Sequence, residues 1–360
     1  MKAPIYIFQP VTLKRKDNTL ALVPFGDAER DLFPGEAIGK ELTEEWPLKE
    51  DDTWWTGTPK HIPIERVESL HAYSSLRINT AFLNFIAEHH IPLHTYNYFG
   101  GYTGTYWPKE PIPNGTIQQQ QFLHYADNTK RLELAKEILR GAFHNMYSGL
   151  AREARRSNKY ADLIENWEFT TNLLEQANSI DMLLGAEGST RKIYYEFLDR
   201  RLTPEFQMKN RVYNPPNNPV NALISYLNSM LYASIISELY RTQLNPLVGY
   251  LHQPGRQRFP LAWDLAELFR PFVVESLVMS LLNKKQIKAT DFEESLNGCM
   301  LNPEGRVKVI RAFEHRMRTT IKHRDLNRSV SYRRLLRLEG YKLVKHLLGE
   351  KKYVSFRIWW

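Results

Sequence analysis

The sequence predicts an α+β protein, in which a β-rich, sandwich-like N-terminal domain (1–108) precedes a larger all-α domain (114–360). Three observations predict this division. The first hundred residues contain short β-branched and aromatic segments separated by turn formers. Long amphipathic patterns follow the proline-rich stretch 108–113. A chain of 360 residues is also longer than one average domain.

In the N-terminal region, the extended segments are PIYIFQP, TLALVPF, HIPIERVESLHAY and IPLHTYNYFGGYTGTYWP. The segment SLRINTAFLNFIAEHH predicts one helix, because four apolar residues lie at helical spacing: Ile78, Phe82, Phe85 and Ile86. Residues 32–59 are acidic, rich in turn formers and without a clear period. We expect them to form an excursion or a surface loop.

The second domain is predicted from long helical patterns. Residues 128–156 form one amphipathic pattern, and residues 221–244 are apolar on nearly all sides, which indicates a central helix. The pattern over 262–285 contains Pro271, which we expect to bend or divide the helix. The basic region from Glu304 onward also predicts helices.

The charge distribution suggests a partner. The chain carries a formal charge of +8, yet residues 306–357 contain 16 Lys or Arg and only 4 Asp or Glu, so the excess is C-terminal. Such a stripe is typical of proteins that bind a phosphate backbone. A solvated helical face is the alternative.

Cys299 is the only cysteine, which excludes an intrachain disulfide and a four-cysteine zinc site and fits a reducing cytoplasm. The N-terminus does not resemble a signal peptide, and no apolar run reaches the length of a membrane span. We expect a soluble, cytoplasmic protein.

Residues 249–271, GYLHQPGRQRFPLAWDLAELFRP, hold three groups able to bind a metal ion: His252, Asp264 and Glu267. A helix that begins near Pro260 would put Asp264 and Glu267 on one face, and a loop could fold His252 back over its start. One imidazole and two carboxylates suit Mg²⁺ or Mn²⁺. On these residues alone, an ordinary solvated helix face remains open.

A second segment, LLGAEGSTRKIYYEFLDRRL, sets Glu187 between Gly185 and Gly188. Glycines at these positions suggest a close approach of the backbone to another helix or to a ligand. The alternative is an ordinary helix start, where Glu187 would interact with the positive end of the helix dipole.

Together, three blocks resemble the CRISPR-associated Cas-one family of metal-dependent DNA endonucleases and integrases. The blocks are GAEGSTRKIYYEFL, YNPPNNPVNALISYLNSMLY and GYLHQPGRQRFPLAWDLAELFRP, in the order and at the spacing of the family. The segments TLKRKDNTLALVPF and IPIERVESLHAYSSLRINTAFLNFIAEHHIPLHTYNYFGGYTGTYWP also resemble its N-terminal β domain. The resemblance covers nearly the whole chain, and the excursion at 32–59 is longer than the usual hairpin of the family.

The resemblance implies roles for single residues. Glu187 and His252 match the catalytic glutamate and histidine, Glu267 matches the distal acidic metal ligand, and Asp264 matches a nearby acidic residue needed for activity. Glu187, His252 and Glu267 would then hold Mg²⁺ or Mn²⁺, with Asp264 behind them or on a second ion. Many relatives carry aspartate at the place of Glu267.

Phosphate contacts are expected from arginines of the second domain, whose alternative role is capping or pairing within the fold: Arg256, Arg258, Arg316, Arg318, Arg333, Arg334 and Arg337. The resemblance further implies a homodimer made through the β domain, with the helical domain catalysing the reaction. It also implies two partners, double-stranded DNA (pre-spacer and CRISPR repeat) and a dimer of the small CRISPR-associated protein called Cas two.

Two other functions remain open. One is a DNA-bridging scaffold that performs no chemistry, and the other is a general structure-selective metallonuclease. A scaffold has no physical need to keep converging metal ligands, so the set of Glu187, His252, Asp264 and Glu267 favours an enzyme.

Overall fold

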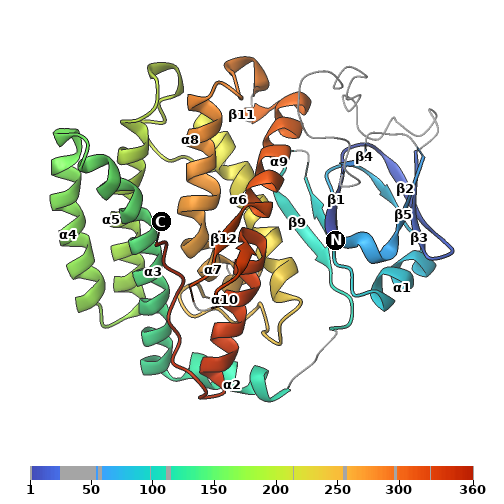
Figure 1. Cartoon of the computed structure of the whole chain (residues 1–360), viewed down its shortest axis with the longest axis horizontal. Coiled ribbons are helices and arrows are strands. Elements are labelled where there is room, and N and C mark those ends of the chain that lie inside the picture. The colour runs from blue at the N-terminus through green and yellow to red at the C-terminus, as the bar shows by residue number, and fades with distance from the viewer. Residues whose placement is uncertain are drawn as a thin grey trace. The chain divides into compact units, whose positions relative to one another are not determined.

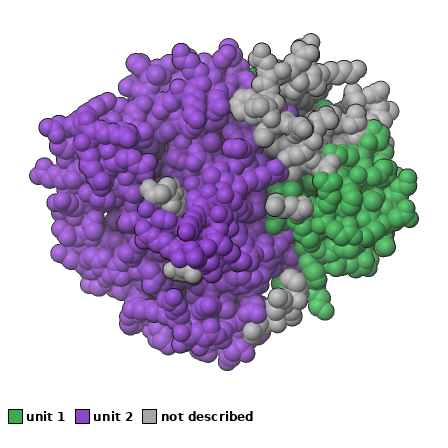
Figure 2. Space-filling view, viewed as in Figure 1, with its two compact units in different colours: residues 1–111, 301–307 green, residues 112–300, 308–360 purple. Residues whose placement is uncertain are grey.

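The computed structural model describes residues 2–24, 54–55, 59–97, 99–110, 115–213, 215–253, 258–295, 298–324 and 326–359. The predicted excursion at 32–59 lies outside these residues except for positions 54, 55 and 59. The chain divides into two compact units, 1–111 with 301–307, and 112–300 with 308–360 (Figure 2). The segment 301–307 therefore groups with the N-terminal unit.

The first unit contains two mixed sheets (Figure 1). The order of one is β4-β1-β6-β8-β9, with β1 Ala3–Ile7, β4 Trp54–Trp55, β6 Val67–Ala72, β8 Leu93–Tyr96 and β9 Tyr102–Tyr106. The order of the other is β5-β3-β2-β7, with β2 Val11–Lys16, β3 Thr19–Pro24, β5 Lys60–Pro63 and β7 Leu76–Arg77. Successive side chains of a strand point to opposite faces of its sheet. Ile5 and Ile7 of β1 therefore share one face, and both join the apolar core that the two sheets share.

The helix α1, Thr80–Glu88, completes this core with three buried side chains: Phe82, Phe85 and Ile86. The prediction that Ile78 shares their face is wrong, since Ile78 precedes the helix and is 40% exposed. The physical reason is the cap. The Asn79 side chain accepts a hydrogen bond from the Phe82 N–H at 2.9 Å, so the helix begins after Asn79.

The second unit is mainly helical (Figure 1). Its helices are α2 Gly115–Ala126, α3 Asn128–Ala154, α4 Ala161–Gln176, α5 Ile180–Asp199, α6 Pro219–Leu239, α7 Pro260–Arg270, α8 Ser276–Asn283 and α10 Tyr332–Leu347. Helix α9, Pro303–Arg318, begins in the segment 301–307 and continues into the second unit. Two hairpins correct the all-α prediction: β10 Phe292–Ser295 with β11 Gly298–Leu301, and β12 Thr320–Lys322 with β13 Ser329–Ser331. The α+β class of the whole chain is confirmed.

Helix α6 is the central helix that its apolar sequence predicts, with buried residues on all sides. In the part of the chain that the structure describes, it is the one helix long and apolar enough to cross a membrane, and 83% of its most apolar window is buried within the protein. Such burial is typical of a core helix.

Pro271 divides the following helix, as predicted. Helix α7 ends at Arg270, a π-helical segment η5 (Pro271–Glu275) follows, and α8 then resumes the α-helical pattern. Proline has no N–H to bond to the carbonyl four residues earlier, so the chain relaxes locally into a wider turn.

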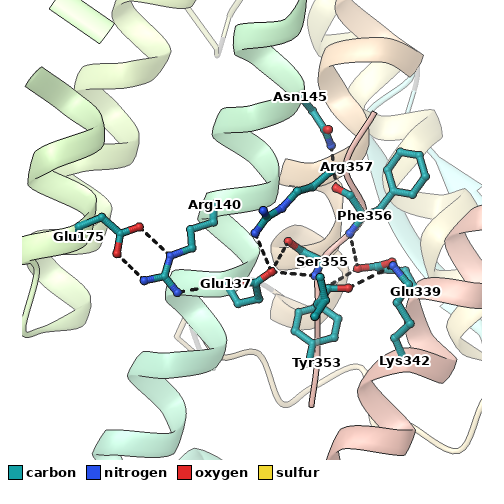
Figure 3. Close-up of polar contacts among 11 residues, drawn as sticks. Glu137, Arg140, Asn145, Glu175, Glu339, Lys342, Tyr353, Ser355, Phe356 and Arg357 are labelled. Carbon is teal, nitrogen blue, oxygen red and sulfur yellow. Dashed lines mark hydrogen bonds and ion pairs between the residues drawn. The ribbon is translucent and has the colours of Figure 1, made fainter. Parts of the chain in front are cut away.

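Residues 351–359 have no regular secondary structure and lie along α3 and α10; we call them the C-terminal strap (Figure 3). Glu137 on α3 accepts hydrogen bonds at 3.0 Å from both the backbone N–H and the hydroxyl of Ser355. Glu339 on α10 accepts from the Tyr353 hydroxyl at 2.6 Å and from the Phe356 N–H at 3.0 Å. Two acidic side chains thus hold the strap by its backbone.

Asn145 ties the strap to α7. Its Nδ2 donates to the carbonyls of Leu268 on α7, at 2.9 Å, and Phe356, at 3.1 Å. Its Oδ1 accepts from the Ile358 N–H at 2.8 Å. One buried amide therefore joins α3, α7 and the strap, and it uses both of its N–H donors and its carbonyl oxygen in doing so.

Gly141 allows the strap and α7 to approach α3 closely. A Cβ placed on Gly141 would lie 2.4 Å from Ser355 Oγ and 2.7 Å from Leu268 Cδ2, both far inside van der Waals contact. We predict that Gly141→Ala lowers the free energy of unfolding by about 1–3 kcal/mol, measured by denaturant titration. Gly149→Ala on the same helix is the control, because its Cβ would meet Phe197 only at 3.9 Å. Equal stability of the two variants would contradict the prediction.

Candidate functional site

Asp264 organises the loop that precedes α7. This carboxylate is fully buried and accepts four hydrogen bonds from residues 250–252. Oδ2 accepts from the backbone N–H groups of Tyr250 at 2.5 Å and Leu251 at 3.1 Å. Oδ1 accepts from the His252 backbone N–H at 2.9 Å. Gly249 permits this fold, since a Cβ there would lie 2.8 Å from Pro260.

The same Asp264 oxygen fixes the ring of His252. The Nδ1 of His252 lies 2.8 Å from Asp264 Oδ1, so Nδ1 carries the proton and Nε2 keeps its lone pair. Burial lowers the pKa of His252, but the hydrogen bond to Asp264 and the negative charges of Asp264 and Glu267 outweigh it, and the net pKa is raised. The side chain remains 19% exposed.

Glu187 lies within α5, so the prediction of a helix start at this residue is wrong. Among the described residues, no atom outside the backbone of α5 comes within 4 Å of a Cβ placed on Gly185 or Gly188. Neither glycine therefore marks a close contact with another described helix. The Glu187 side chain is 19% exposed, and burial together with the charge of Glu267 raises its pKa.

Arg191, one turn after Glu187, binds three carboxylates. Its Nε lies 3.3 Å from Glu187, its Nη1 lies 3.2 Å from Glu275, and its Nη2 pairs with Glu267. Arg270 pairs with the other oxygen of Glu267. Burial alone would raise the pKa of Glu267, but the two guanidinium groups hold it at about 2.

Sequence reasoning missed three members of this cluster, Arg191, Arg270 and Glu275. Arg270 stands three residues after Glu267, at the spacing of a helical ion pair. Glu275 is fully buried in η5, and burial raises its pKa. A signal existed for each of them. Arg191 stands four residues after Glu187, the spacing of a helical ion pair, and Glu275 is the one charge within an apolar run.

The fit of a divalent ion depends on the donors that these side chains present. Among the described residues, no three His, Cys, Asp or Glu side chains are gathered closely enough to hold a metal ion. The side chains of Glu187 and His252 are each 19% exposed, and their donor types suit Mg²⁺ or Mn²⁺. Both oxygens of Glu267 are engaged by arginines, so an ion would have to compete with Arg191 and Arg270.

The arginines expected to contact phosphate occupy different environments. Arg256 lies outside the described residues, while Arg258 is exposed and stacks on Phe259 at 5.4 Å. Arg333 and Arg337 form ion pairs at 2.6 Å with the buried residues Glu314 and Glu238. These two have a role within the fold, and we leave them out of the proposed interface. The others are half-buried or exposed: Arg316, Arg318 and Arg334.

Comparison with known sequences finds similarity over most of the chain. A family model described as CRISPR associated protein Cas1 matches residues 48–315. A CRISPR-associated endonuclease Cas1 from Fusobacterium nucleatum is 38% identical over 360 residues, which cover 100% of this chain and 98% of the relative. A CRISPR-associated protein Cas1 from Methanobrevibacter ruminantium is 42% identical over 301 residues, 84% of this chain and 91% of the relative.

Solved structures share the fold. A CAS1 protein from Thermotoga maritima superposes with a TM-score of 0.80 at 32% identity, over 99% of this chain and 100% of that chain. A casposase bound to its integration product superposes with a TM-score of 0.81 over 99% of this chain and 93% of that chain. Its identity is 19%, so that likeness concerns the fold alone.

We predict that Asp264→Asn lowers the pKa of His252 in the metal-free protein. The carboxylate now raises that pKa against the effect of burial, so its neutralisation leaves burial to dominate. In the wild type, the raised pKa of His252 contributes stability at low pH that disappears as pH rises through it, and the variant should lose this contribution. An NMR titration of the imidazole measures the pKa. A pKa equal to that of the wild type would contradict the role of Asp264.

We predict that Arg191→Met lowers the free energy of unfolding by about 3–5 kcal/mol at neutral pH, because Glu267 and Glu275 stay buried with less compensating charge. In the wild type, the pKa of Glu267 is lowered from 4.5 to about 2, which contributes stability above pH 4.5 that is lost toward pH 2. The deficit of the variant should therefore shrink as pH falls.

The control for this experiment is Arg191→Met combined with Glu275→Gln, which removes one buried charge along with the guanidinium. Denaturant titrations of both proteins across pH measure the difference. If the second substitution restored no stability at neutral pH, the electrostatic explanation would be wrong.

Proposed function

The chain belongs to the Cas1 family of CRISPR-associated proteins, and from this premise we propose that it is a metal-dependent DNA endonuclease and integrase. It would join the 3′-hydroxyl ends of pre-spacer DNA to a CRISPR repeat. One observation carries the proposal: Glu187, His252, Asp264 and Glu267 come from segments far apart in the sequence and interact electrostatically in one site. The side chains of Glu187 and His252 reach solvent at this site.

Glu187, His252 and Glu267 would hold Mg²⁺ or Mn²⁺. When bound, such an ion neutralises charge on the scissile phosphate and lowers the pKa of a water or hydroxyl nucleophile. Asp264 contributes indirectly, since both its oxygens are occupied by residues 250–252 and it orients the His252 ring. We therefore place Asp264 behind the ligands rather than on a second ion.

Other residues of the site keep the ligands in the required state. Arg191 and Arg270 keep Glu267 ionised despite complete burial, so no proton has to be removed from this carboxylate before a cation binds. Gly188, the residue after Glu187 on α5, adds no side chain to the helix surface there. A DNA backbone could approach Glu187 there without displacing protein atoms.

The proposed reaction balances without a covalent protein intermediate. The 3′-oxygen of the donor forms a bond to phosphorus while the bond from that phosphorus to the leaving oxygen breaks. The attacking hydroxyl loses its proton, and the leaving 3′-oxygen gains one. With water as nucleophile, the same geometry gives a nicked strand.

The proposed partners are double-stranded DNA, a second copy of the chain and a dimer of the small Cas2 protein. Support for DNA comes from the basic C-terminal region, in which Arg316, Arg318 and Arg334 are half-buried or exposed. Support for the Cas2 partner is family membership. Affinity for DNA should fall steeply with salt.

We predict that Glu187→Gln and His252→Ala each reduce strand transfer by about a hundredfold or more, because each removes a group that would act on charge developing at phosphorus. DNA binding should remain nearly unchanged. The assay combines the protein, its Cas2 partner, a pre-spacer duplex and a repeat-bearing plasmid. Mn²⁺ binding, followed by electron paramagnetic resonance, should weaken in the same variants.

Glu196→Gln is the control, since Glu196 lies on the opposite face of α5 and is exposed. Full strand transfer by Glu187→Gln would exclude the mechanism. DNA binding without strand transfer by the wild type would indicate a scaffold, and cleavage without joining at repeat borders would indicate a general nuclease.

A further inference from the structure

A cavity of about 440 Å³ lies in the helical unit, beside the candidate site but not part of it. Residues of α3, α5, η5, α8, α9, α10 and the C-terminal strap line it. Its volume falls in the range of cavities that hold small molecules. None of Glu187, His252, Asp264 and Glu267 lines it, so the proposed chemistry leaves it without a role.

Cations dominate the wall of the cavity. Four basic residues line it, Arg152, Arg201, Lys284 and Arg316, against one carboxylate, Glu153. Glu153 lies 3.5 Å from Arg201 and 3.8 Å from Arg156, so one negative charge is shared between two arginines. Like charges around one cavity repel each other, and an anion bound there would relieve the repulsion.

The inner wall is aromatic. Tyr194, Phe197, Phe272 and Tyr332 line the cavity and are buried. The guanidinium of Arg201 lies 5.2 Å from the Phe197 ring centre, which shows that flat groups already stack at this wall. Aromatic walls of this kind accept the face of a base.

Polar groups are also available at the cavity. Ser280 and Asn283 line it, and neither side chain forms a hydrogen bond within the described ranges. A hydroxyl and an amide can donate to or accept from the edge of a base. The cavity therefore combines cations that could bind a phosphate, aromatic side chains that could pack against a base, and polar side chains that could form hydrogen bonds with its edge.

We propose that this cavity binds a nucleoside monophosphate unit, with the phosphate near the arginines and Lys284 and the base against the aromatic wall. The unit could be a free nucleotide or one nucleotide of a single DNA strand. Helix α5 carries both Glu187 and the cavity residues Tyr194, Phe197 and Leu198, which at a rise of ~1.5 Å per residue lie roughly 10–17 Å from Glu187 along the helix. A DNA strand that enters the candidate site could thus place a nearby nucleotide in the cavity. That the nucleotide belongs to a DNA strand rests on the proposed function.

The test measures binding by the full-length chain, without metal or partner. Calorimetric titrations with dAMP, TMP, inorganic phosphate and a short oligothymidylate provide the probes. We expect both nucleotides to bind more tightly than phosphate, because only they reach the aromatic wall. The variant Arg152→Ala/Lys284→Ala alters two exposed residues and should weaken nucleotide binding by about tenfold or more.

The matched control is Lys351→Ala/Lys352→Ala, which removes the same charge from two exposed residues of the C-terminal strap that do not line the cavity. It should stay within about twofold of the wild type. A second variant, Ser280→Phe, fills the cavity and should weaken dAMP more than phosphate. If that variant unfolds, the charge variants still decide the matter.

Several outcomes would overturn the proposal: no nucleotide or oligothymidylate binding by the wild type, equal affinity for phosphate and dAMP, or equal loss in the cavity and control variants. Binding of oligothymidylate but not of dAMP, lost only in the cavity variant, supports the strand as the source. Binding of dAMP alone supports a free nucleotide. Since no strand transfer is measured, failure of the proposed function would leave these results unchanged.

Discussion

A single guanidinium in the interior is the constraint on which the rest of the site depends. Arg191 binds Glu187, Glu267 and Glu275, which come from two helices and the π-helical segment between α7 and α8. Without it, the buried Glu267 and Glu275 and the partly buried Glu187 would repel each other or take up protons. Arg191 lowers the pKa of all three carboxylates: Glu267 stays ionised, while burial still raises the pKa values of Glu187 and Glu275.

Helix α7 is held at both ends. Near its start, Asp264 accepts hydrogen bonds from the backbone of residues 250–252 and orients the His252 ring. Toward its end, the Leu268 carbonyl is bound by Asn145, which also holds the strap. Asp264 and Glu267 therefore lie on a helix that is fixed at both ends, and Asp264 also fixes the loop that carries His252. Catalytic groups need this kind of support, since small displacements weaken their electrostatic effect.

The sequence predicted the α+β class, the central helix, the break at Pro271 and the four residues of the candidate site. Spacing along a helix and family blocks carried these predictions. The hairpins of the second unit, the partners of Arg333 and Arg337, and the role of Glu275 were missed. Each depends on contacts between distant residues, such as Glu238 with Arg337, and periodicity within one segment contains no information about them. Glu267 has one methylene more than aspartate, and the sequence alone did not show that its carboxylate pairs with two arginines, Arg191 and Arg270.

The π-helical segment has a consequence for the angular phase of the chain. In an uninterrupted α-helix, eight residues from Glu267 to Glu275 would leave the two side chains about 80° apart around the axis. A π turn contains more residues and rotates less at each one, so the five residues of η5 return Glu275 toward the side of Glu267. Both carboxylates can then reach the same guanidinium. The π-helical segment thus takes up about one extra residue, and it places Glu275 where an uninterrupted helix would place residue 274.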